Sequence, residues 1–392
     1  MKVLYLINAG IMGGRERHVM TLVRSLPKEI EYCICAVSAG EATEAMQAAG
    51  LNVRVLGGCN GHDLHVFPRF IRLLREFKPD VVHAHSVALL PYVAMRFFPK
   101  IALVQSVHGP SVSGVEWAAR RKSIAWKMKS SLSWILERKP DYYLPVSQAT
   151  WDEFKIVHPD AKGEVFFNAL NLDALPAARR SRGDRPTVCG GQGSVRPTED
   201  VSQQTSATRR RVVGMVGRMA DQKDWPSFAK IAGILKERKP ELEIWGVGAS
   251  EEWARENVGE DARHVKWFGS RQDARELIAQ MDVFVMTSKH EQLPTTMLEA
   301  FAMHVPVAGF LPEGGTSEVL ALAQGCEAAL MNKERDCAKA ADAVIRILSD
   351  DALYADMVRE GDRIVHEYFD MKKLCATQLL DVYRKIAPAR RV

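Results

Sequence analysis

The sequence lacks any hydrophobic run long enough to cross a membrane. Of the 392 residues, 47% are hydrophobic and 26% are charged, but no apolar stretch approaches the roughly 20 residues that a spanning helix needs. The first apolar run, residues 1–8, is too short for a secretory signal and predicts a first strand instead. Length and composition are typical of a globular protein of two domains.

Cysteine is sparse and scattered. The chain has seven cysteines, an odd number, and none of them forms a C-x-x-C pair. A disulfide framework and a cysteine-based metal site are therefore disfavoured. The pattern fits a reducing compartment, so we expect a cytoplasmic protein without a bound metal.

A strong excess of charge of one sign is also missing. The formal net charge is +5 at pH 7. This balance suits an anionic small ligand or a membrane surface and gives no support for nucleic acid as a partner. We also find no sequence repeat of the solenoid type.

The dinucleotide-binding fingerprint is absent. Residues 10–18, which follow the first predicted strand, lack the spacing G-x-G-x-x-G, and no acidic residue closes the second strand at Val37 and Ser38. A nicotinamide-dependent dehydrogenase is therefore disfavoured. Gly13 and Gly14 allow the backbone to approach a ligand closely; the alternative is a tight strand–helix turn.

The chain does contain a regular alternation of short apolar runs with amphipathic segments. We predict strands at residues 3–7, 32–37, 53–56, 80–83, 101–107, 142–146 and 164–167, with helices at 18–26, 42–49, 66–77 and 88–98. Further strands are predicted at 212–216, 242–245, 265–268, 283–286 and 305–308. This pattern predicts an α/β fold with two doubly wound, Rossmann-like domains facing across a cleft. Open α/β sheets bind ligands at the carboxyl ends of their strands, which would meet that cleft.

Composition changes divide the chain into parts. We predict an N-terminal domain over 1–175, a flexible linker over 176–211, a C-terminal domain over 212–370 and a C-terminal helix over 371–392 that packs back toward the N-terminal domain. The linker is rich in Gly, Ser, Thr, Gln and Arg and almost free of large apolar residues. Its basic residues either contact a partner or are solvated, and the solvated interpretation is preferred.

One stretch, residues 283–302, predicts a buried strand, a polar turn and a helix. Thr295 and Thr296 are expected to cap the helix and leave its first N–H groups pointing into the turn. A helix start at the carboxyl end of a strand favours anions. Glu291 and Glu299 bracket this turn, so we interpret it as a nucleotide site with phosphates on the turn and Glu299 on the ribose. The alternative is an ordinary strand–helix connection with two surface glutamates.

Two further strand ends carry candidate site residues. Arg218 and Lys223 follow the strand at 212–216 and are predicted to clamp a diphosphate, or else are solvated surface charges. His108 follows the strand at 101–107 and would face the cleft, although a lone histidine is often structural. His83 and His85 show no third ligand at metal spacing and are interpreted as structural.

A basic segment at residues 117–139 contains tryptophans among lysines and arginines. This composition is typical of a helix that lies on an anionic membrane surface. The alternative is a helix packed on the sheet with a solvated basic face.

These motifs resemble those of the retaining nucleotide-sugar glycosyltransferases of family 4, which have the two-domain GT-B fold. In the second half, the matching residues are Gly217-Arg218 with Lys223, the residues at 245–248 and 267–269, Ser288 to Glu291 with Glu299-Ala300, and the residues at 306–308 and 313–315. The first half resembles the family more loosely, through Gly13-Gly14 and His108. The resemblance covers nearly the whole chain outside the linker.

The resemblance implies a role for each matched position. Arg218 and Lys223 would bind the donor diphosphate, Glu299 the ribose, and Glu291 would lie near the transferred sugar. The backbone of Leu293, Pro294, Thr295 and Thr296 would meet the phosphates. Gly14 would lie under the diphosphate, and His108 would contact the sugar and the diphosphate. The implied catalytic set is His108, Glu291, Arg218 and Lys223, in a metal-independent enzyme without a cofactor whose N-terminal domain receives the acceptor.

The sequence departs from the family pattern at Gln292, where the family usually has glycine. This side chain lies where the backbone nears the donor sugar, so the donor is left open among UDP-, GDP- and ADP-sugars. The leading expectation is transfer to a glycan or lipid-linked acceptor in bacterial cell-surface polysaccharide or lipopolysaccharide synthesis, on or near the inner face of the membrane. A nucleotide-sugar epimerase of the same fold and a non-catalytic nucleotide-sugar-binding protein remain alternatives.

Overall fold

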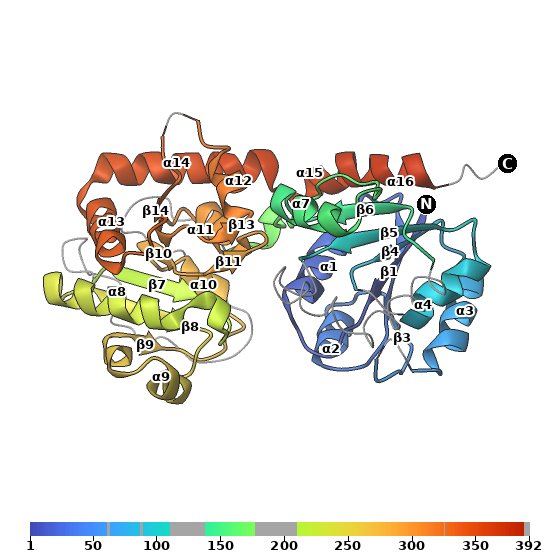
Figure 1. Cartoon of the computed structure of the whole chain (residues 1–392), viewed down its shortest axis with the longest axis horizontal. Coiled ribbons are helices and arrows are strands. Elements are labelled where there is room, and N and C mark those ends of the chain that lie inside the picture. The colour runs from blue at the N-terminus through green and yellow to red at the C-terminus, as the bar shows by residue number, and fades with distance from the viewer. Residues whose placement is uncertain (61–62, 87–88, 110–137, 177–209, 325, 388–392) are drawn as a thin grey trace, which may run out of the picture. The chain divides into compact units, whose positions relative to one another are not determined.

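The computed structural model describes residues 1–60, 63–86, 89–109, 138–176, 210–324 and 326–387 (Figure 1). These residues form two compact units. The first comprises Met1–Asn171 with Met371–Val392, and the second comprises Leu172–Asp370. Nearly all of the predicted linker and most of the basic segment at 117–139 lie outside the described residues.

The sheet of the first unit has the strand order β3-β2-β1-β4-β5-β6, and every pair in it is parallel. Its strands are β1 (Lys2–Ile7), β2 (Glu31–Ala36), β3 (Val53–Val55), β4 (Val81–Ala84), β5 (Ala102–Val107) and β6 (Tyr142–Pro145). The helices are α1 (Gly14–Arg24), α2 (Glu41–Ala48), α3 (Val66–Phe77), α4 (Leu89–Ala94) and α7 (Gln148–Val157). Because the order reverses between β1 and β4, the carboxyl ends of these two strands open the crevice where such sheets bind ligands.

The sheet of the second unit repeats this plan with the order β14-β12-β10-β7-β8-β9. Its strands are β7 (Val212–Val216), β8 (Glu243–Val247), β9 (Lys266–Trp267), β10 (Val283–Met286), β12 (Val307–Phe310) and β14 (Ala329–Asn332). The helices are α8 (Trp225–Arg238), α9 (Glu251–Asn257), α10 (Ala274–Ile278), α11 (Thr295–Ala302), α12 (Thr316–Leu320), α13 (Cys337–Ser349) and α14 (Asp351–Tyr368). Here the order reverses between β7 and β10.

The two units have separate hydrophobic cores. Leu4, Leu6, Val82 and Phe70 are fully buried in the first, where branched side chains cover both faces of a parallel sheet. In the second core, Trp225 and Phe310 pack among strand and helix residues and are completely buried. The sheets are therefore rigid supports for the loops at their carboxyl ends.

The C-terminal segment returns to the first unit. It forms α15 (Met371–Leu374), a π-helical turn (Cys375–Leu379) and α16 (Leu380–Ile386). The hydroxyl of Tyr383 lies 3.1 Å from the hydroxyl of Tyr5 and 2.6 Å from Nδ1 of His83. These buried hydrogen bonds tie α16 to β1 and β4, which Figure 1 shows side by side with the red C-terminal helix nearby.

The predicted strand at 164–167 is wrong. Residues 162–166 make three backbone hydrogen bonds with β6, and they form one bridge, from Gly163 to Tyr143. The next bridge would need a backbone N–H from Pro145, which proline lacks, so the ladder ends there. The carbonyl oxygen of Val165 instead accepts from Nε2 of Gln378 at 2.7 Å, and the same nitrogen donates to Oε1 of Glu164 at 3.0 Å.

Candidate functional site

The loop after β7 carries the two predicted diphosphate-binding cations. The aliphatic stem of Lys223 packs over Gly217, where a Cβ atom would lie 3.1 Å from Cγ of the lysine. Nε1 of Trp225 donates to the carbonyl oxygen of Arg218 at 2.9 Å and fixes the loop against α8. Arg218 is exposed, and no hydrogen bond or ion pair of its guanidinium is found within the described part of the chain. That cation is therefore available to a ligand.

Lys223 and Glu291 form an ion pair at the centre of this site. Nζ of Lys223 lies 2.5 Å from Oε1 of Glu291, and the two side chains are only 13% and 10% exposed. Two charges withdrawn from water to this degree are costly unless they are paired, so the loss of either partner would leave the other buried without compensation. The structure thus brings together two of the predicted catalytic residues that are 68 residues apart in the sequence.

The backbone of Glu291 is held by a small separate sheet. β11 (His290–Glu291) pairs in parallel with β13 (Glu313–Gly314), and the N–H of Gly315 donates to the carbonyl oxygen of Glu291 at 2.9 Å. Gly314 has φ of +103°, and a Cβ atom there would meet that same carbonyl oxygen. The Glu-Gly-Gly sequence at 313–315 therefore fixes the position of the Glu291 backbone. Sequence analysis had interpreted residues 288–294 as a turn without a strand.

Glu299 has a different partner. Nε of Arg275, on α10, donates to Oε1 of Glu299 at 2.8 Å, and Nη2 lies 2.7 Å from the same oxygen. No hydrogen bond to Oε2 of Glu299 is found among the residues that the structure describes. The arginine orients the carboxylate and leaves one oxygen to accept a hydroxyl hydrogen bond.

Helix α11 begins at Thr295, but its predicted cap is wrong. The N-cap position is Pro294, and no side chain makes a capping hydrogen bond there. Proline in the cap position has no hydroxyl to offer, and the N–H of Thr295 donates to the carbonyl oxygen of Leu293 at 2.9 Å. The N–H of Met297 donates to the carbonyl oxygen of Pro294, whereas no hydrogen bond of the Thr296 N–H is found among the described residues. An anion at this helix start would therefore bind the N–H of Thr296.

Gln292, the residue that departs from the family pattern, is not free. Its Nε2 lies 2.5 Å from Nε2 of His290. Leu293 beside it is 6% exposed. The amide is thus folded against the preceding strand residue.

Arg335 joins the parts of this site and was missed by sequence analysis. Its guanidinium donates to Oδ2 of Asp224 at 2.5 Å and to the carbonyl oxygens of Thr287 and Ser288 at 2.7 and 2.9 Å. It also lies 4.7 Å above the ring of Phe310. Asp224 is the N-cap of α8, and Thr287 follows β10. Arg335 thus fixes the loop of Lys223 to the end of β10, over a separation of 111 residues from Asp224 that no local pattern reveals.

The first unit presents a glycine turn at the start of α1. Gly13 is the N-cap of the helix, and its N–H donates to Oε2 of Glu16 at 3.2 Å. A Cβ atom on Gly14 would meet no atom within 4 Å. The helix therefore starts at Gly14, four residues before the predicted start, with open space above that residue.

Four histidines of the first unit converge below this turn. His18 comes from α1, His83 from β4, His85 from the residue after β4, and His108 from the residue after β5. The ring of His85 lies 4.3 Å from that of His83, 5.3 Å from that of His108 and 5.4 Å from that of His18, measured between centroids. Nδ1 of His85 is 3.1 Å from Nε2 of His108. We call these four residues the histidine cluster.

Burial keeps the histidine cluster neutral. Loss of solvent lowers the pKa of His18 to about 4 and that of His83 to about 3, with His18 adding repulsion at His83. The pKa values of His85 and His108 are also lowered, first by burial and then by the neighbouring histidines. Sequence analysis singled out His108 and took His83 and His85 as structural, without seeing that they form one cluster. No group of His, Cys, Asp or Glu among the described residues is arranged to hold a metal ion.

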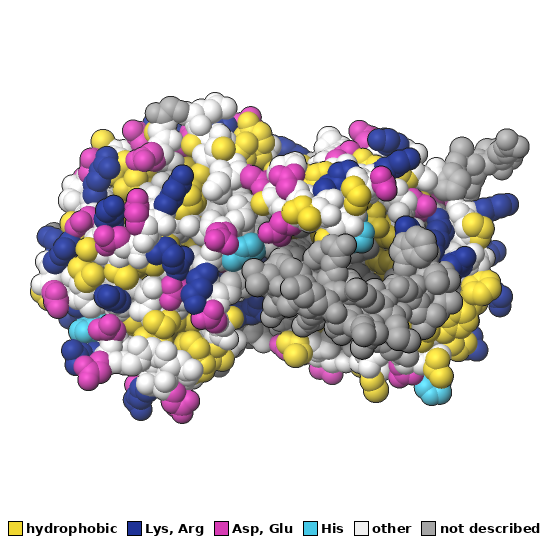
Figure 2. Space-filling view, viewed as in Figure 1, with side chains coloured by type: hydrophobic (Ala, Val, Ile, Leu, Met, Phe, Trp, Pro, Cys, Tyr) yellow, Lys and Arg dark blue, Asp and Glu magenta, His cyan; other side chains and the backbone are white. Residues whose placement is uncertain are grey.

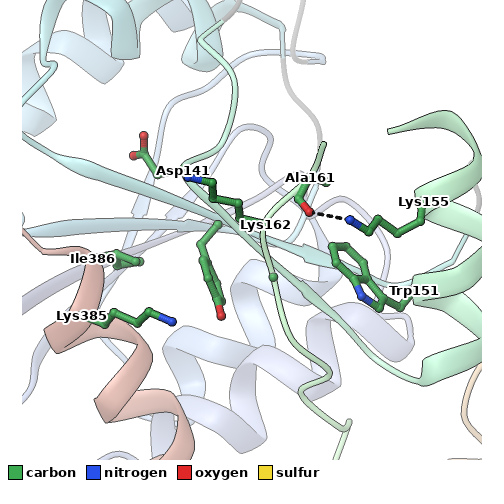
Figure 3. A pocket seen from close by; sticks show the side chains of 9 residues that line it. Asp141, Trp151, Lys155, Ala161, Lys162, Lys385 and Ile386 are labelled. Carbon is green, nitrogen blue, oxygen red and sulfur yellow. Dashed lines mark hydrogen bonds between the residues drawn. The ribbon is translucent and has the colours of Figure 1, made fainter. Parts of the chain in front are cut away.

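A separate hollow of the first unit lies beside the amino end of β6. Its volume is about 600 Å³, and Tyr142, Trp151, Lys155, Lys162 and Lys385 are among its lining residues (Figure 3). Lys155 lies 5.2 Å from the ring of Trp151 and donates to two backbone carbonyl oxygens. His108 follows the opposite, carboxyl end of the neighbouring strand β5, so this hollow is distinct from the histidine cluster.

On the visible face of the second unit, charges of both signs are mixed (Figure 2). In Figure 2, lysine and arginine side chains are interspersed with aspartate and glutamate over the visible face of that unit. Among the described residues, no helix is long and apolar enough to span a bilayer.

Both halves of the chain match models of glycosyltransferase families. The family described as Glycosyltransferase Family 4 matches residues 12–174, and the one described as Glycosyl transferases group 1 matches residues 210–350. The first match contains Gly13, Gly14 and His108, and the second contains the predicted residues of the second unit.

Named relatives and a solved structure support the same assignment as the family models. The chain is 32% identical over 320 residues to the putative glycosyltransferase EpsF of Bacillus subtilis, and this match spans 78% of each chain. It is 31% identical over 130 residues to the lipopolysaccharide core biosynthesis glycosyltransferase LpsE of Rhizobium meliloti, a match that spans 32% of this chain and 36% of LpsE. The crystal structure of Anabaena HepE in complex with UDP has the same fold, with a TM-score of 0.74 at 17% identity over 98% of this chain and 100% of that one. The chain therefore belongs to the glycosyltransferases of the GT-B fold.

Proposed function

We propose that the protein transfers a sugar from a nucleotide-sugar donor to a glycan or glycolipid acceptor, with retention of the anomeric configuration. The observation that carries this proposal is the grouping at the carboxyl ends of β7 and β10. An exposed Arg218, the Lys223–Glu291 pair and the uncapped start of α11 lie on neighbouring loops of one sheet edge. A diphosphate needs this combination of cations and free N–H groups.

Each residue of the second unit has a role in this proposal. Arg218 and Lys223 neutralise the diphosphate. In the backbone of residues 293–296, the N–H groups of Leu293 and Thr296 donate to it, since Pro294 has no N–H and that of Thr295 donates to the carbonyl oxygen of Leu293. Oε2 of Glu299 accepts a hydrogen bond from a ribose hydroxyl while Arg275 holds Oε1. Glu291, already paired with Lys223, lies nearest the transferred sugar, with Gln292 beside it.

In the first unit, His108 is proposed to contact the donor, and Gly13 with Gly14 to bring backbone close to it. The open space above Gly14 supports that role, because a ligand can approach the backbone there. Support for His108 comes from its place after β5, at the same edge of the sheet as Gly13.

The reaction we propose is a front-side displacement. The acceptor hydroxyl forms a bond to the anomeric carbon on the face from which the nucleotide leaves, the bond from that carbon to the phosphate oxygen breaks, and the hydroxyl proton passes to the departing phosphate. Negative charge grows on the leaving diphosphate, so Arg218 and Lys223 bind the transition state more tightly than the substrate. No metal or cofactor is included in this scheme.

We propose a chemical class for the nucleotide-sugar donor and another for the acceptor. HepE binds UDP, and LpsE is named for lipopolysaccharide core synthesis. We therefore propose a UDP-sugar as the first donor to test, followed by GDP- and ADP-sugars, and a bacterial cell-surface polysaccharide or lipopolysaccharide as the acceptor class. The proposed location is the cytoplasm or the inner face of the membrane.

The test begins with thermal shifts in the three nucleoside diphosphates, since a ligand of the folded state raises the melting temperature. The matching nucleotide-sugar is then incubated with cell-envelope acceptors, with and without EDTA, and the product linkage is determined by NMR. Transfer with the anomeric configuration of the donor is expected. A changed sugar that still carries its nucleotide would indicate epimerisation, and binding without release of nucleoside diphosphate would indicate a binding protein.

A further inference from the structure

The histidine cluster contains two buried nitrogen atoms that no hydrogen bond satisfies. Among the described residues, these are Nδ1 of His18 and Nε2 of His85. His18 is 6% exposed and His85 is 2% exposed. By contrast, both ring nitrogens of His83 are used, since Nδ1 faces the hydroxyl of Tyr383 at 2.6 Å and Nε2 faces Oγ of Ser106 at 2.9 Å. The unsatisfied atoms therefore belong to the part of the cluster next to His108.

A neutral histidine carries one N–H, so the contact between His85 and His108 has two possible proton arrangements. In the first, Nδ1–H of His85 donates to Nε2 of His108, and the orphaned Nε2 of His85 is a bare lone pair. In the second, Nε2–H of His108 donates to His85, and the orphaned Nε2 of His85 carries a proton. Burial keeps both rings neutral, which excludes an arrangement with protons on all four nitrogens.

The surroundings favour the first arrangement. A buried N–H without an acceptor is rarer in proteins than an acceptor without a donor. His83 cannot supply an acceptor to His85, because its two nitrogens are already bonded.

We propose that His85 is a positioning residue that holds His108 as the tautomer protonated on Nδ1. Nε2 of His108 then accepts the hydrogen bond from His85, and Nδ1–H is the group left to face a substrate. In the part of the chain that the structure describes, Nδ1 of His108 makes no hydrogen bond. A fixed donor at this position suits an oxygen-rich ligand such as a sugar hydroxyl or a phosphate. The inference rests on the proposed function, in which His108 contacts the donor.

The tautomer is measured without reference to activity. The full-length protein, labelled with ¹⁵N in histidine, is examined by long-range ¹H–¹⁵N NMR at pH 7.5, where protonated and unprotonated ring nitrogens have well-separated shifts. His108, assigned by comparison with His108→Asn, is expected to carry its proton on Nδ1. A proton on Nε2 of His108 overturns the proposal.

Two variants of His85 then separate positioning from packing. The amide of His85→Asn can occupy the place of Nδ1 and preserve the donor, whereas that of His85→Gln reaches toward the place of Nε2. We expect kcat to fall about tenfold in the Gln variant, the cost of one oriented hydrogen bond, and to stay within a few-fold of wild type in the Asn variant. Equal losses in the two variants, or a loss confined to KM, contradict the proposal.

The control is His65→Gln, at an exposed histidine before α3. It should change neither kcat nor the His108 shifts. The NMR result also distinguishes the two levels of inference. If His108 has the expected tautomer but no donor is turned over, the proposed function fails; if sugar is transferred while His108 is protonated on Nε2, only the inference about His85 fails.

Discussion

In both units, polar residues lie at the carboxyl ends of parallel strands. They are neutral in the first unit and form pairs of opposite charge in the second. In the first unit, the carboxyl ends of β4 and β5 hold the histidine cluster, in which His18, His83 and His85 are buried and withdrawal from water lowers the pKa of every member. In the second, the carboxyl ends of β7 and β10 hold formal charges in pairs, Lys223 with Glu291 and Arg335 with Asp224. A doubly wound sheet therefore fixes where a site forms, whereas burial and pairing decide which chemistry it supports.

The difference predicts that acid destabilises the first unit much more than the second, and this is the largest effect we expect. Histidines in the unfolded chain bind protons near pH 6.5, while His18 and His83 in the folded chain stay neutral down to about pH 4 and 3. The unfolded state thus binds more protons between these limits, so stability is intact above pH 6.5 and falls as the pH decreases. The loss is roughly 1.4 kcal/mol per pH unit for each such histidine.

Hydrogen exchange measured by mass spectrometry at pH 7 and pH 5, corrected for intrinsic rates, locates this loss. Exchange should accelerate in β1, β4 and β5 far more than in β7 and β10. None of the described histidines of the second unit is buried, so none carries a comparable cost of protonation. Equal acceleration of hydrogen exchange in both units would show that protonation of the histidine cluster is not what destabilises the protein in acid.

Removing the cation of the central pair tests the second unit. Lys223→Ala is expected to lower turnover by on the order of 100-fold or more, as for the loss of one transition-state donor. Lys230→Ala, on the exposed face of α8, is the control and should be unaffected. Turnover within a few-fold of wild type would remove Lys223 from the catalytic set.

Stability and catalysis at this pair can be separated. Lys223→Ala also leaves Glu291 buried without a partner, which is destabilising by itself. The double variant Lys223→Met with Glu291→Gln removes both charges, so it should recover stability in urea titrations but not turnover. Recovery of turnover in the double variant would mean that the pair is structural.

The second carboxylate has a predicted role of its own. Glu299→Ala is expected to lower turnover by about 100-fold through the loss of a ribose contact, an effect comparable to removing one oriented donor. Arg275→Met leaves the carboxylate in place and should have a smaller effect, seen mainly in KM for the donor. Calorimetric titration with nucleoside diphosphate compares the two variants; tighter or equal binding in Glu299→Ala would contradict the assignment.

The smallest predicted effect concerns the backbone behind Arg218. Gly248 has φ of +110°, and a Cβ atom there would lie 2.0 Å from the carbonyl oxygen of Gly217. Gly259 has φ of +85° with nothing within 4 Å of such an atom. Gly259→Ala should therefore lose about 1 kcal/mol for the strained φ alone, whereas Gly248→Ala loses more because the loop must also shift. Equal unfolding midpoints in urea for the two variants would show that the close contact at residue 248 adds no destabilisation of its own.

Local patterns in the sequence were sufficient for most strands of both sheets. Short apolar runs such as Val283–Met286 are buried on both faces and appear where they were predicted. The strand predicted at 164–167 fails because its neighbour β6 ends in Pro145, which has no N–H to continue the ladder. An apolar run predicts burial, but it does not predict which strand will be its neighbour or which hydrogen bonds that neighbour can supply.

The candidate site shows the same limit. Glu291 and Lys223 were singled out individually, but their pairing, and the partners Arg275 and Arg335, arise only when separate loops meet. The histidine cluster is the clearest case, because three of its members seemed unremarkable by sequence. Chemistry carried by one loop can be read from sequence, whereas chemistry shared among loops requires the fold.

The hydroxyl of Tyr383 has a consequence for how the protein is made. Residues 1–171 are synthesised long before residue 383, so His83 and Tyr5 must wait for their hydrogen-bonding partner. During that interval the nascent first unit exposes the surface that α16 will cover. Completion of the buried hydrogen bonds among Tyr5, Tyr383 and His83 is therefore coupled to the translation of α16.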